Sequence, residues 1–378
     1  MEIKLFKSGK HLNQAGFKSF LPEKINQEWI ISTPEILTLL DRSTGKLGAL
    51  NAFSSLIPDI NIFIRMHVVK EATTSSRIEG TQTLIEEAVL IKSQVDPEQR
   101  DDWQEVQNYI KAMDFAIKKL EKLPLSNRLL KDTHRILMQG VRGKNKTPGD
   151  FRRSQNWIGG ATLADAVYIP PPHNEVTELM SDLEKFLHNT DINVPPLLRI
   201  AIAHYQFETI HPFLDGNGRL GRLLITLYLV SNNILKKPAL YLSDYFERNR
   251  QLYYDNLTTV RTKNNLIQWL KFFLIGIIET ADKSTQTFEA VIKLRQIIET
   301  KKIPTLGKRS SLALDAMQFL YSKPVINVND FIDELSISKP TANALVKDLI
   351  RLKILKERTG FKRNRIFVFE EYLDFFRK

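Results

Sequence analysis

The sequence of 378 residues predicts a mainly helical protein with a short β-hairpin and a small C-terminal winged helix-turn-helix module. Apolar residues recur three and four positions apart through most of the chain, as on the buried face of a helix. Strand signals are confined to residues 149–172 and to the end of the chain. An apolar content of 43% supports sizeable cores, so we expect two or three globular domains.

Composition limits the functional classes. Lys and Arg number 54 against 43 Asp and Glu, and this excess favours anionic partners such as nucleotides or nucleic acid. Cysteine is absent, which excludes a disulfide framework. Residues 1–10 hold no apolar run of signal-peptide length, and the longest apolar stretch, 272–278, is too short for a bilayer. We therefore expect a cytoplasmic protein with no membrane partner.

Helical periodicity recurs from residue 37 onward. Residues 1–35 contain Pro22 and Pro34 and no recognisable chemistry, and we expect them to wrap the helical body. The expected helices are 37–50, 60–70, 101–120, 129–138, one within 171–187, one from Pro195 toward His211, one from Gly216 to about Asn232, one within 241–260, then 266–278 and 288–298.

Residues 149–172 differ from these helices. The segment holds Trp157-Ile158, the turn signal Gly159-Gly160 and Val167-Tyr168-Ile169 before three prolines. We interpret it as a short hairpin flap. A surface hairpin without function is the alternative.

The C-terminal part follows a basic linker, 301–308, that contains proline and glycine. Beyond it the pattern predicts helices 312–320, 328–334 and 340–352 and two short strands around 359–364, which is the order of a winged helix-turn-helix. A recognition helix would begin at 339–343, and Lys362, Arg363 and Arg365 on the wing would meet DNA phosphates. Use of the module for protein contacts or dimerisation is the alternative.

The chemistry is concentrated in the stretch 211–222, His-Pro-Phe-Leu-Asp-Gly-Asn-Gly-Arg-Leu-Gly-Arg. Its glycines open a helix whose free backbone N–H groups and positive dipole end suit phosphate. Arg219 and Arg222, one turn apart, can add planar forks for phosphate oxygens. Asp215 is an oxygen ligand suited to Mg²⁺, and a neutral His211 could take a proton from a hydroxyl. The residues therefore predict an anion site with a metal ligand and a base.

Two alternatives concern the surrounding residues. His204, Glu208 and His211 share a helix face, but a zinc site of the HExxH kind requires a different order. Further upstream, Ser76 and Glu79 fit a capping box at the start of a helix.

Position by position, residues 211–222 resemble the HxFx(D/E)GNGRxxR motif of the Fic family. Ser75, Glu79 and Gly80 are similar to that family's (S/T)xxxE(G/N) inhibitory motif, in which the glutamate pairs with the second arginine of the main motif. The flap residues Trp157, Ile158 and Gly159 resemble the region that positions the target segment in Fic proteins.

The resemblance implies transfer of AMP from Mg-ATP to Tyr, Ser or Thr hydroxyls of a protein, which can be the chain itself. It implies His211 as general base and Asp215 as metal ligand. The remaining roles it implies are phosphate binding by Gly216, Asn217 and Gly218, β- and γ-phosphate contacts by Arg219 and Arg222, a place for Tyr254 near the adenine pocket, and inhibition by Glu79 pairing with Arg222.

The expected domains are an N-terminal helical region with the inhibitory helix (1–95), a catalytic core (96–300), the linker (301–308) and the winged module (309–378). Two other functions stay open at this point. One is a nucleotide-responsive DNA-binding regulator or toxin-antitoxin component, with DNA contacted by residues 309–378. The other is an enzyme of the same fold that removes AMP, and either could act as a homodimer.

Overall fold

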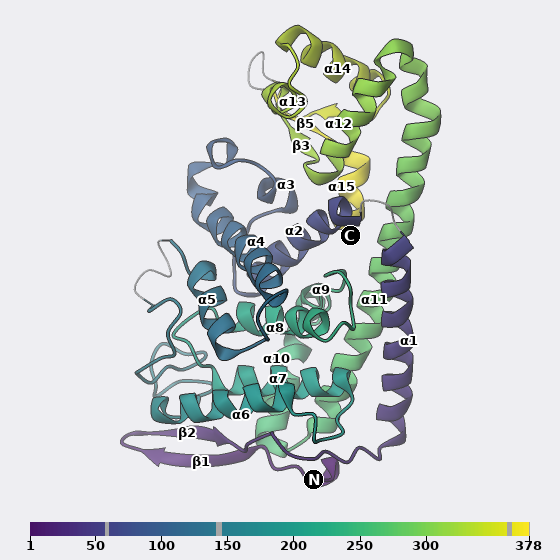
Figure 1. The fold of residues 1–378 in the computed structure, drawn as a ribbon. Helices are drawn as coiled ribbons and strands as arrows, with labels where there is room; N and C mark the ends of the chain where they lie inside the picture. The colour runs from purple at the N-terminus through teal and green to yellow at the C-terminus, as the bar shows by residue number, and fades with distance from the viewer. Residues whose placement is uncertain (57–59, 141–145, 361–364, 378) are drawn as a thin grey trace.

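The structure is a computed structural model that describes residues 1–56, 60–140, 146–360 and 365–377 (Figure 1). It confirms the prediction of a mainly helical fold with small antiparallel sheets. The helices before the C-terminal module are α1 (Pro34–Leu56), α2 (Ile60–Ile78), α3 (Ile85–Ala88), α4 (Arg100–Leu120), α5 (Asn127–Leu137), α6 (Val176–His188), α7 (Pro196–Ile210), α8 (Asn217–Ser231), α9 (Ser243–Arg248), α10 (Arg250–Lys263) and α11 (Leu266–Ile297).

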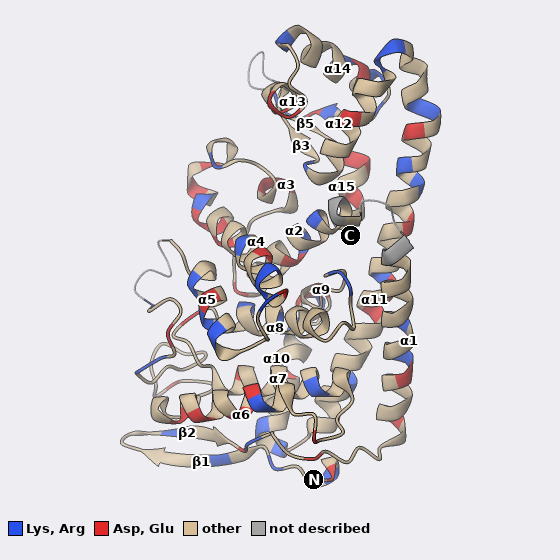
Figure 2. Ribbon diagram, viewed as in Figure 1, with Lys and Arg blue, Asp and Glu red and all other residues tan. Residues whose placement is uncertain are grey.

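Helix α7 lies at the centre of the body. Every residue from Leu197 to Ile210 is buried, and α6, α8 and α11 pack around it. The long helix α11 runs beside α1 along one side of the molecule (Figure 1). Lys, Arg, Asp and Glu are spread over all parts of the ribbon (Figure 2). None of the described helices combines the length and the apolar character that a bilayer crossing requires.

The N-terminal segment differs from the expectation of a simple wrap. Strands β1 (Gly9–Gln14) and β2 (Phe17–Pro22) form an antiparallel hairpin in which Gly9 pairs with Pro22. The Phe20 backbone N–H donates to Ile169 O at 2.9 Å. The hairpin therefore continues into the flap, a long-range pairing that local periodicity does not predict.

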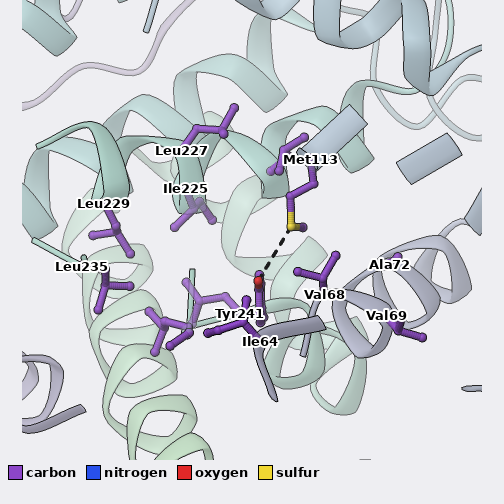
Figure 3. Close-up of a cluster of buried hydrophobic side chains, with 14 of the residues drawn as sticks. Ile64, Val68, Val69, Ala72, Met113, Ile225, Leu227, Leu229, Leu235 and Tyr241 are labelled. Carbon is purple, nitrogen blue, oxygen red and sulfur yellow. Dashed lines mark hydrogen bonds between the residues drawn. The ribbon is translucent and has the colours of Figure 1, made fainter. Parts of the chain in front are cut away.

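Helix α2 connects three parts of the molecule. Its Ile64, Val68, Val69 and Ala72 belong to an apolar cluster that also holds Met113 of α4, Ile225 of α8 and Tyr241 (Figure 3). Within that cluster the Tyr241 hydroxyl donates to Met113 Sδ at 3.8 Å. The helix continues to Ile78, beyond the expected end at residue 70, and so brings Ser75 to the middle of the body.

The C-terminal module consists of α12 (Ser310–Ser322), β3 (Val325–Ile326), α13 (Val328–Leu335), α14 (Lys339–Arg351), β4 (Lys356–Glu357), β5 (Phe367–Val368) and α15 (Glu370–Arg377). The strands form one antiparallel sheet in the order β3-β5-β4. The three helices and the strands β4 and β5 follow the predicted order, whereas β3 and α15 were not predicted. Lys362 and Arg363 lie outside the described residues, and the described Arg365 donates to Glu357 Oε2 at 3.3 Å.

The expected linker is helical and partly buried. Residues Ile298–Lys302 form a π-helix that continues α11, and Ile303–Arg309 form 3-10 turns that are interrupted by a kink at Gly307, with φ 60° and ψ −120°. Ile303 and Leu306 are buried because they pack into the hydrophobic core. The basic residues that suggested a linker lie on the outer side of these turns, since Lys301, Lys308 and Arg309 are exposed.

The C-terminal module packs directly on α2. The ring of Phe63 meets Tyr321 of α12 edge-on at 5.4 Å between centroids. The imidazole of His67 meets Phe376 of α15 in the same way at 5.2 Å. Beyond α2, Glu86 of α3 forms an ion pair with Arg377 of α15 at 2.8 Å. Helix α2 therefore lies between the C-terminal module and the body.

Candidate active site

The segment 211–216 turns the chain from α7 into α8. His211 ends α7 in a left-handed conformation, with φ 50°, and its N–H donates to Phe207 O at 2.9 Å. Gly216 precedes α8 and is also left-handed, with φ 74°, which a glycine adopts without steric cost. The expected helix-loop-helix is therefore present, with the glycine at the start of the second helix.

Side chains from the flap region hold this loop by its backbone. Arg152 donates from Nε to His211 O at 3.0 Å and from Nη2 to Ile210 O at 3.3 Å. Asn156 Nδ2 donates to Phe213 O at 2.9 Å. Within the loop, the Asn217 amide accepts from Phe213 N and donates to Phe213 O, each at 2.8 Å. The peptide groups of the loop are thus fixed from both sides.

His134 of α5 fixes the next part of the loop. The Gly149 N–H donates to His134 Nδ1 at 2.9 Å, so the ring proton lies on Nε2, which donates to Asp215 O at 2.9 Å. The ring also stacks on Phe213, with 3.8 Å between centroids. Burial lowers the pKa of His134 to about 4, so the neutral tautomer persists at neutral pH. His134 is therefore a packed, hydrogen-bonded histidine.

The imidazole of His211 lies half-buried beside the loop. Desolvation of the ring, followed by the nearby charge of Arg152, lowers the pKa of His211 to about 4. Its Nδ1 atom is buried and accepts no hydrogen bond from the described residues. At neutral pH the ring is therefore uncharged and able to accept a proton.

Glu79 reaches the start of α8, where the glycines would receive an anion. An ideal Cβ placed on Gly218 would lie 2.3 Å from Glu79 Oε1, so the carboxylate rests against the bare backbone there. The same oxygen accepts from Arg222 Nη2 at 2.7 Å. Ser75 completes the contact, because its hydroxyl accepts from Arg222 Nε at 2.9 Å and its carbonyl from Nη2 at 2.8 Å.

The capping-box alternative for Ser76 and Glu79 does not match this geometry. Both residues lie at the C-terminal end of α2, whereas a capping box belongs to the start of a helix. Gly80 follows with φ 104°, a backbone conformation that favours glycine and directs the chain away from the site. Ser75 and Glu79 instead converge on Arg222.

The charges of this cluster are strongly coupled. Burial alone would raise the pKa of Glu79, but the charge and hydrogen bond of Arg222 outweigh it and hold that pKa below its ordinary value. Burial alone would lower the pKa of Arg222, but the charge of Glu79 outweighs it and raises that pKa above its ordinary value. The Oε1 atom of the neighbouring Glu208 of α7 is buried without a hydrogen-bond partner among the described residues, and burial raises the pKa of Glu208 to about 7. Glu208 lies against Gly221, where a Cβ would come within 2.2 Å of Oε1.

Arg219 lies on the other side of the same helix turn. It donates from Nη1 to Glu105 Oε2 of α4 at 3.1 Å, with 6% of its own side chain exposed. The two residues and Asp215 line a cavity of about 300 Å³. Asp215 Oδ1 accepts from the Gly216 N–H at 2.6 Å. In the described part of the chain, no three His, Asp or Glu side chains gather closely enough to hold a metal by themselves.

The flap is smaller than a full hairpin. Ile158 and Tyr168 form a single antiparallel bridge, and Gly159 and Gly160 both have positive φ. The Tyr168 hydroxyl donates to Thr209 O at 2.8 Å and so ties the flap to α7. Trp157, with 39% of its surface exposed, stays on the outside.

Two ring side chains near the motif, those of His204 and Tyr254, have different surroundings. His204 bonds Gly221 O and the Tyr253 hydroxyl, each at 2.9 Å, and is therefore structural, not part of a zinc site. Tyr254, which is 38% exposed, lies next to Tyr253, and the charges of Glu79 and Arg222 act on its hydroxyl.

Sequence reasoning missed several residues that shape the site. Arg152 and Asn156 act through backbone carbonyls that no local pattern reveals, and Glu105 lies more than a hundred residues from its partner. Glu208 was considered only as a zinc ligand. The sequence did hold one signal for the position of Glu208. Gly221 lies one turn from Gly218, and a glycine inside a helix often marks a close contact with another side chain.

Residues 37–118 match the family model Fic/DOC family N-terminal, and residues 124–229 match the model Fic/DOC family. Curated relatives are named protein adenylyltransferase Fic. The one from Drosophila willistoni is 31% identical over 52% of this chain and 39% of its own length, and the one from Drosophila mojavensis is 32% identical over 52% and 40%. The chain thus spans about two fifths of the length of these relatives.

Solved structures share the fold. A Fic family protein from Desulfovibrio desulfuricans G20 superposes with a TM-score of 0.58 at 23% identity, over 91% of this chain and 98% of that one. Fic-1 from C. elegans, residues 134–508, superposes with a TM-score of 0.51 at 20% identity, over 69% and 75%.

Proposed function

The chain belongs to the Fic/DOC family through residues 37–118 and 124–229, and on that premise we propose that it is a protein adenylyltransferase held inactive by Glu79. The observation that supports this most is the convergence of three groups at the start of α8. They are a neutral imidazole, an N–H cradle without side chains at Gly216 and Gly218, and a carboxylate that already lies in that cradle.

In the proposed reaction the nucleotide binds with its β- and γ-phosphates at the N-terminus of α8. The Gly216, Asn217 and Gly218 amides and the two arginines donate to the phosphate oxygens, since a helix N-terminus favours negative charge. His211 takes the proton of a Tyr, Ser or Thr hydroxyl of the target protein. The hydroxyl oxygen bonds to the α-phosphorus while the bond to the β-phosphate bridging oxygen breaks, and pyrophosphate leaves.

Mg²⁺ fits the residues at this site. Mg²⁺ is commonly bound by one or two carboxylates together with phosphate oxygens and water, and Asp215 offers a carboxylate at the mouth of the cradle. When bound, the ion would neutralise phosphate charge. Asp215 would be its protein ligand, with its main chain fixed by His134.

The inhibition proposed for Glu79 follows from charge and space. Its carboxylate rests against Gly218 and binds Arg222, so it takes both the room and the cation that a γ-phosphate would use. ATP could then enter only in a pose whose α-phosphorus is misplaced for attack, and small misplacements cost much in rate. A Glu79 that aligns water in place of a hydroxyl would remove AMP, which is the alternative within the same fold.

Parallel labelling tests this function. The Glu79→Gly chain is incubated with a candidate target and either base-labelled or γ-labelled ATP. Label retained on protein only from base-labelled ATP supports AMP transfer, whereas γ label on protein means phosphorylation and contradicts the proposal. Release of base label from pre-labelled protein by the unmodified chain would favour the AMP-removing alternative.

A second activity, duplex DNA binding, is supported by one face of α14. Lys347 and Arg351 are exposed about one turn apart on α14, and Lys339 is exposed at the start of the same helix, which follows the turn after α13. Arg351 also pairs with Asp348 at 3.2 Å. Gel-shift titrations of the full chain should show binding that weakens steeply with salt, and less steeply after Lys347→Ala with Arg351→Ala. Lys10→Ala with Lys18→Ala on the N-terminal hairpin is the matched control. Absence of binding at low salt would favour a protein-contact role.

A further inference from the structure

The two motif arginines lie in opposite situations. Both nitrogens on the side edge of Arg222 are bound by the C-terminal end of α2 and the residue after it. Nε donates to Ser75 Oγ, and Nη2 donates to Ser75 O and Glu79 Oε1. No part of that edge is left for a ligand until α2 changes.

Arg219 is held by its other end. Nη1 donates to Glu105 Oε2 at 3.1 Å, and among the described residues the acceptor of Nη2 is a weak one, Met138 Sδ, at 3.6 Å. Its Nε is buried and has no hydrogen-bond partner among the described residues. A buried charged N–H without an acceptor is costly, so this edge is one that a ligand oxygen would satisfy.

Glu105 is well placed to fix that edge. It comes from α4, which packs against α8, and its side chain is 17% exposed at the wall of the cavity that Arg219 and Asp215 share. Because a guanidinium is planar and rigid, anchoring Nη1 also sets the direction of Nε and Nη2. An arginine fixed before the ligand arrives loses less conformational freedom on binding.

We propose that Glu105 is a positioning residue for Arg219: by binding Nη1 it aims the Nε and Nη2 edge at the phosphate oxygens of the bound nucleotide. This inference rests on the function proposed above and adds a residue to it. It differs from the role proposed for Glu79, because Glu79 lies in the cradle itself and binds the edge that a ligand needs.

The opposing view is that Glu105 is a second inhibitor. Removing a carboxylate beside an anion site should by simple charge repulsion strengthen ATP binding. A positioning role predicts the reverse. The two views therefore give opposite signs in one measurement.

The experiment is calorimetric titration with ATP and Mg²⁺, in the Glu79→Gly background so that Arg222 is free. We expect Glu105→Ala to raise the Kd for ATP by roughly tenfold, the scale of one hydrogen bond to a charged group. Glu105→Gln should stay within about threefold of the parent, because its amide oxygen still accepts from Nη1. Asp101→Ala, which removes an exposed carboxylate lining the same cavity, is the charge-matched control and should not weaken binding.

A second series tests the route through Arg219. With Arg219→Ala present, Glu105→Ala should have no further effect on the Kd, since the aimed group is gone. Unchanged or tighter ATP binding by Glu105→Ala would overturn the proposal, as would a loss of equal size in the Arg219→Ala background. If melting curves show that Glu105→Ala does not fold, Glu105→Asp replaces it, because Asp keeps the charge but has a shorter side chain. A higher Kd for ATP then supports the proposal, and an unchanged or lower Kd contradicts it.

The outcomes separate this inference from the proposed function. A chain that binds ATP but transfers no AMP contradicts the reaction, and the Kd values still test Glu105. A Glu79→Gly chain that binds no ATP at all contradicts both.

Discussion

The two halves of the segment 211–222 are held in different ways. Residues 211–216 are fixed through main-chain atoms by Arg152, Asn156 and His134, all of them buried. The arginines that follow are held through their charged ends by Glu79 and Glu105, each more exposed than its arginine. The first half is therefore set when the chain folds, whereas the arginines depend on two carboxylates: Glu79 just past α2, which a ligand would displace, and Glu105 of α4, which would stay in place.

The largest expected effect tests the fixed half. His211→Ala should lower AMP transfer by at least about 100-fold, because the imidazole that would take the hydroxyl proton is lost. The melting temperature should change little, since the backbone contacts of the loop remain. His173→Ala, at an exposed histidine, is the control. Near-normal labelling by His211→Ala would contradict its role.

The next effect tests the exchangeable half. Glu79→Gly should raise labelling roughly tenfold to a hundredfold, since a hydrogen bond to a charged group is worth about 1.5–3 kcal/mol. The gain should vanish when Arg222→Ala is added. Glu98→Gly, at an exposed glutamate, controls for loss of charge. Lower stability without a gain in labelling would show that Glu79 serves the fold and not inhibition.

A smaller effect separates the parts of the α2 contact. Ser75→Ala removes one acceptor of Arg222 and leaves the Ser75 carbonyl and Glu79 in place. We expect a gain in labelling of about fivefold, for about 1 kcal/mol. Ser76→Ala is the matched control, because that buried hydroxyl has no hydrogen-bond partner among the described residues. Equal labelling by the two variants would exclude a role for the Ser75 hydroxyl.

The smallest effect on labelling is expected at Glu208. Burial raises its pKa from 4.5 to about 7, so the folded chain binds this proton more tightly than the unfolded chain. The free energy of unfolding should then fall as pH rises from about 4.5 to 7, by about 3 kcal/mol for this group, and stay level above. Glu208→Gln should remove that loss and leave labelling unchanged. Melting curves at pH 5 and pH 8 that change equally in both chains would contradict this.

The sequence predicted the part of the site whose chemistry is local. His211, Asp215, the glycines and both arginines follow one another within twelve residues, so their types and spacing are enough to predict an anion site. Ser75 and Glu79 were linked to Arg222 only through the family resemblance. Glu105 and Arg152 could not be found in that way, because each acts on a partner that only the packing of helices brings near.

The fold was predicted best where periodicity is strong. Residues 279–287 are mostly polar, and this gap divided α11 into two expected helices, although the structure has one helix through it. The N-terminal hairpin was missed although its pairing is local, because β1, Gly-Lys-His-Leu-Asn-Gln, is mostly polar and shows no apolar alternation. Helix α15 was also missed, though Tyr372, Leu373 and Phe376 gave it a short apolar face.

The position of α2 between the body and the C-terminal module limits how the chain can be cut. Phe63 and His67 at one end of the helix are covered by Tyr321 and Phe376, while Ser75 at the other end binds Arg222. The helix spans 19 residues, or roughly 28 Å at 1.5 Å per residue. Truncation before residue 310 would strip the cover from the same helix that carries the inhibitory contact. The body and the C-terminal module are therefore separate along the sequence, but both are stabilised by contacts with α2.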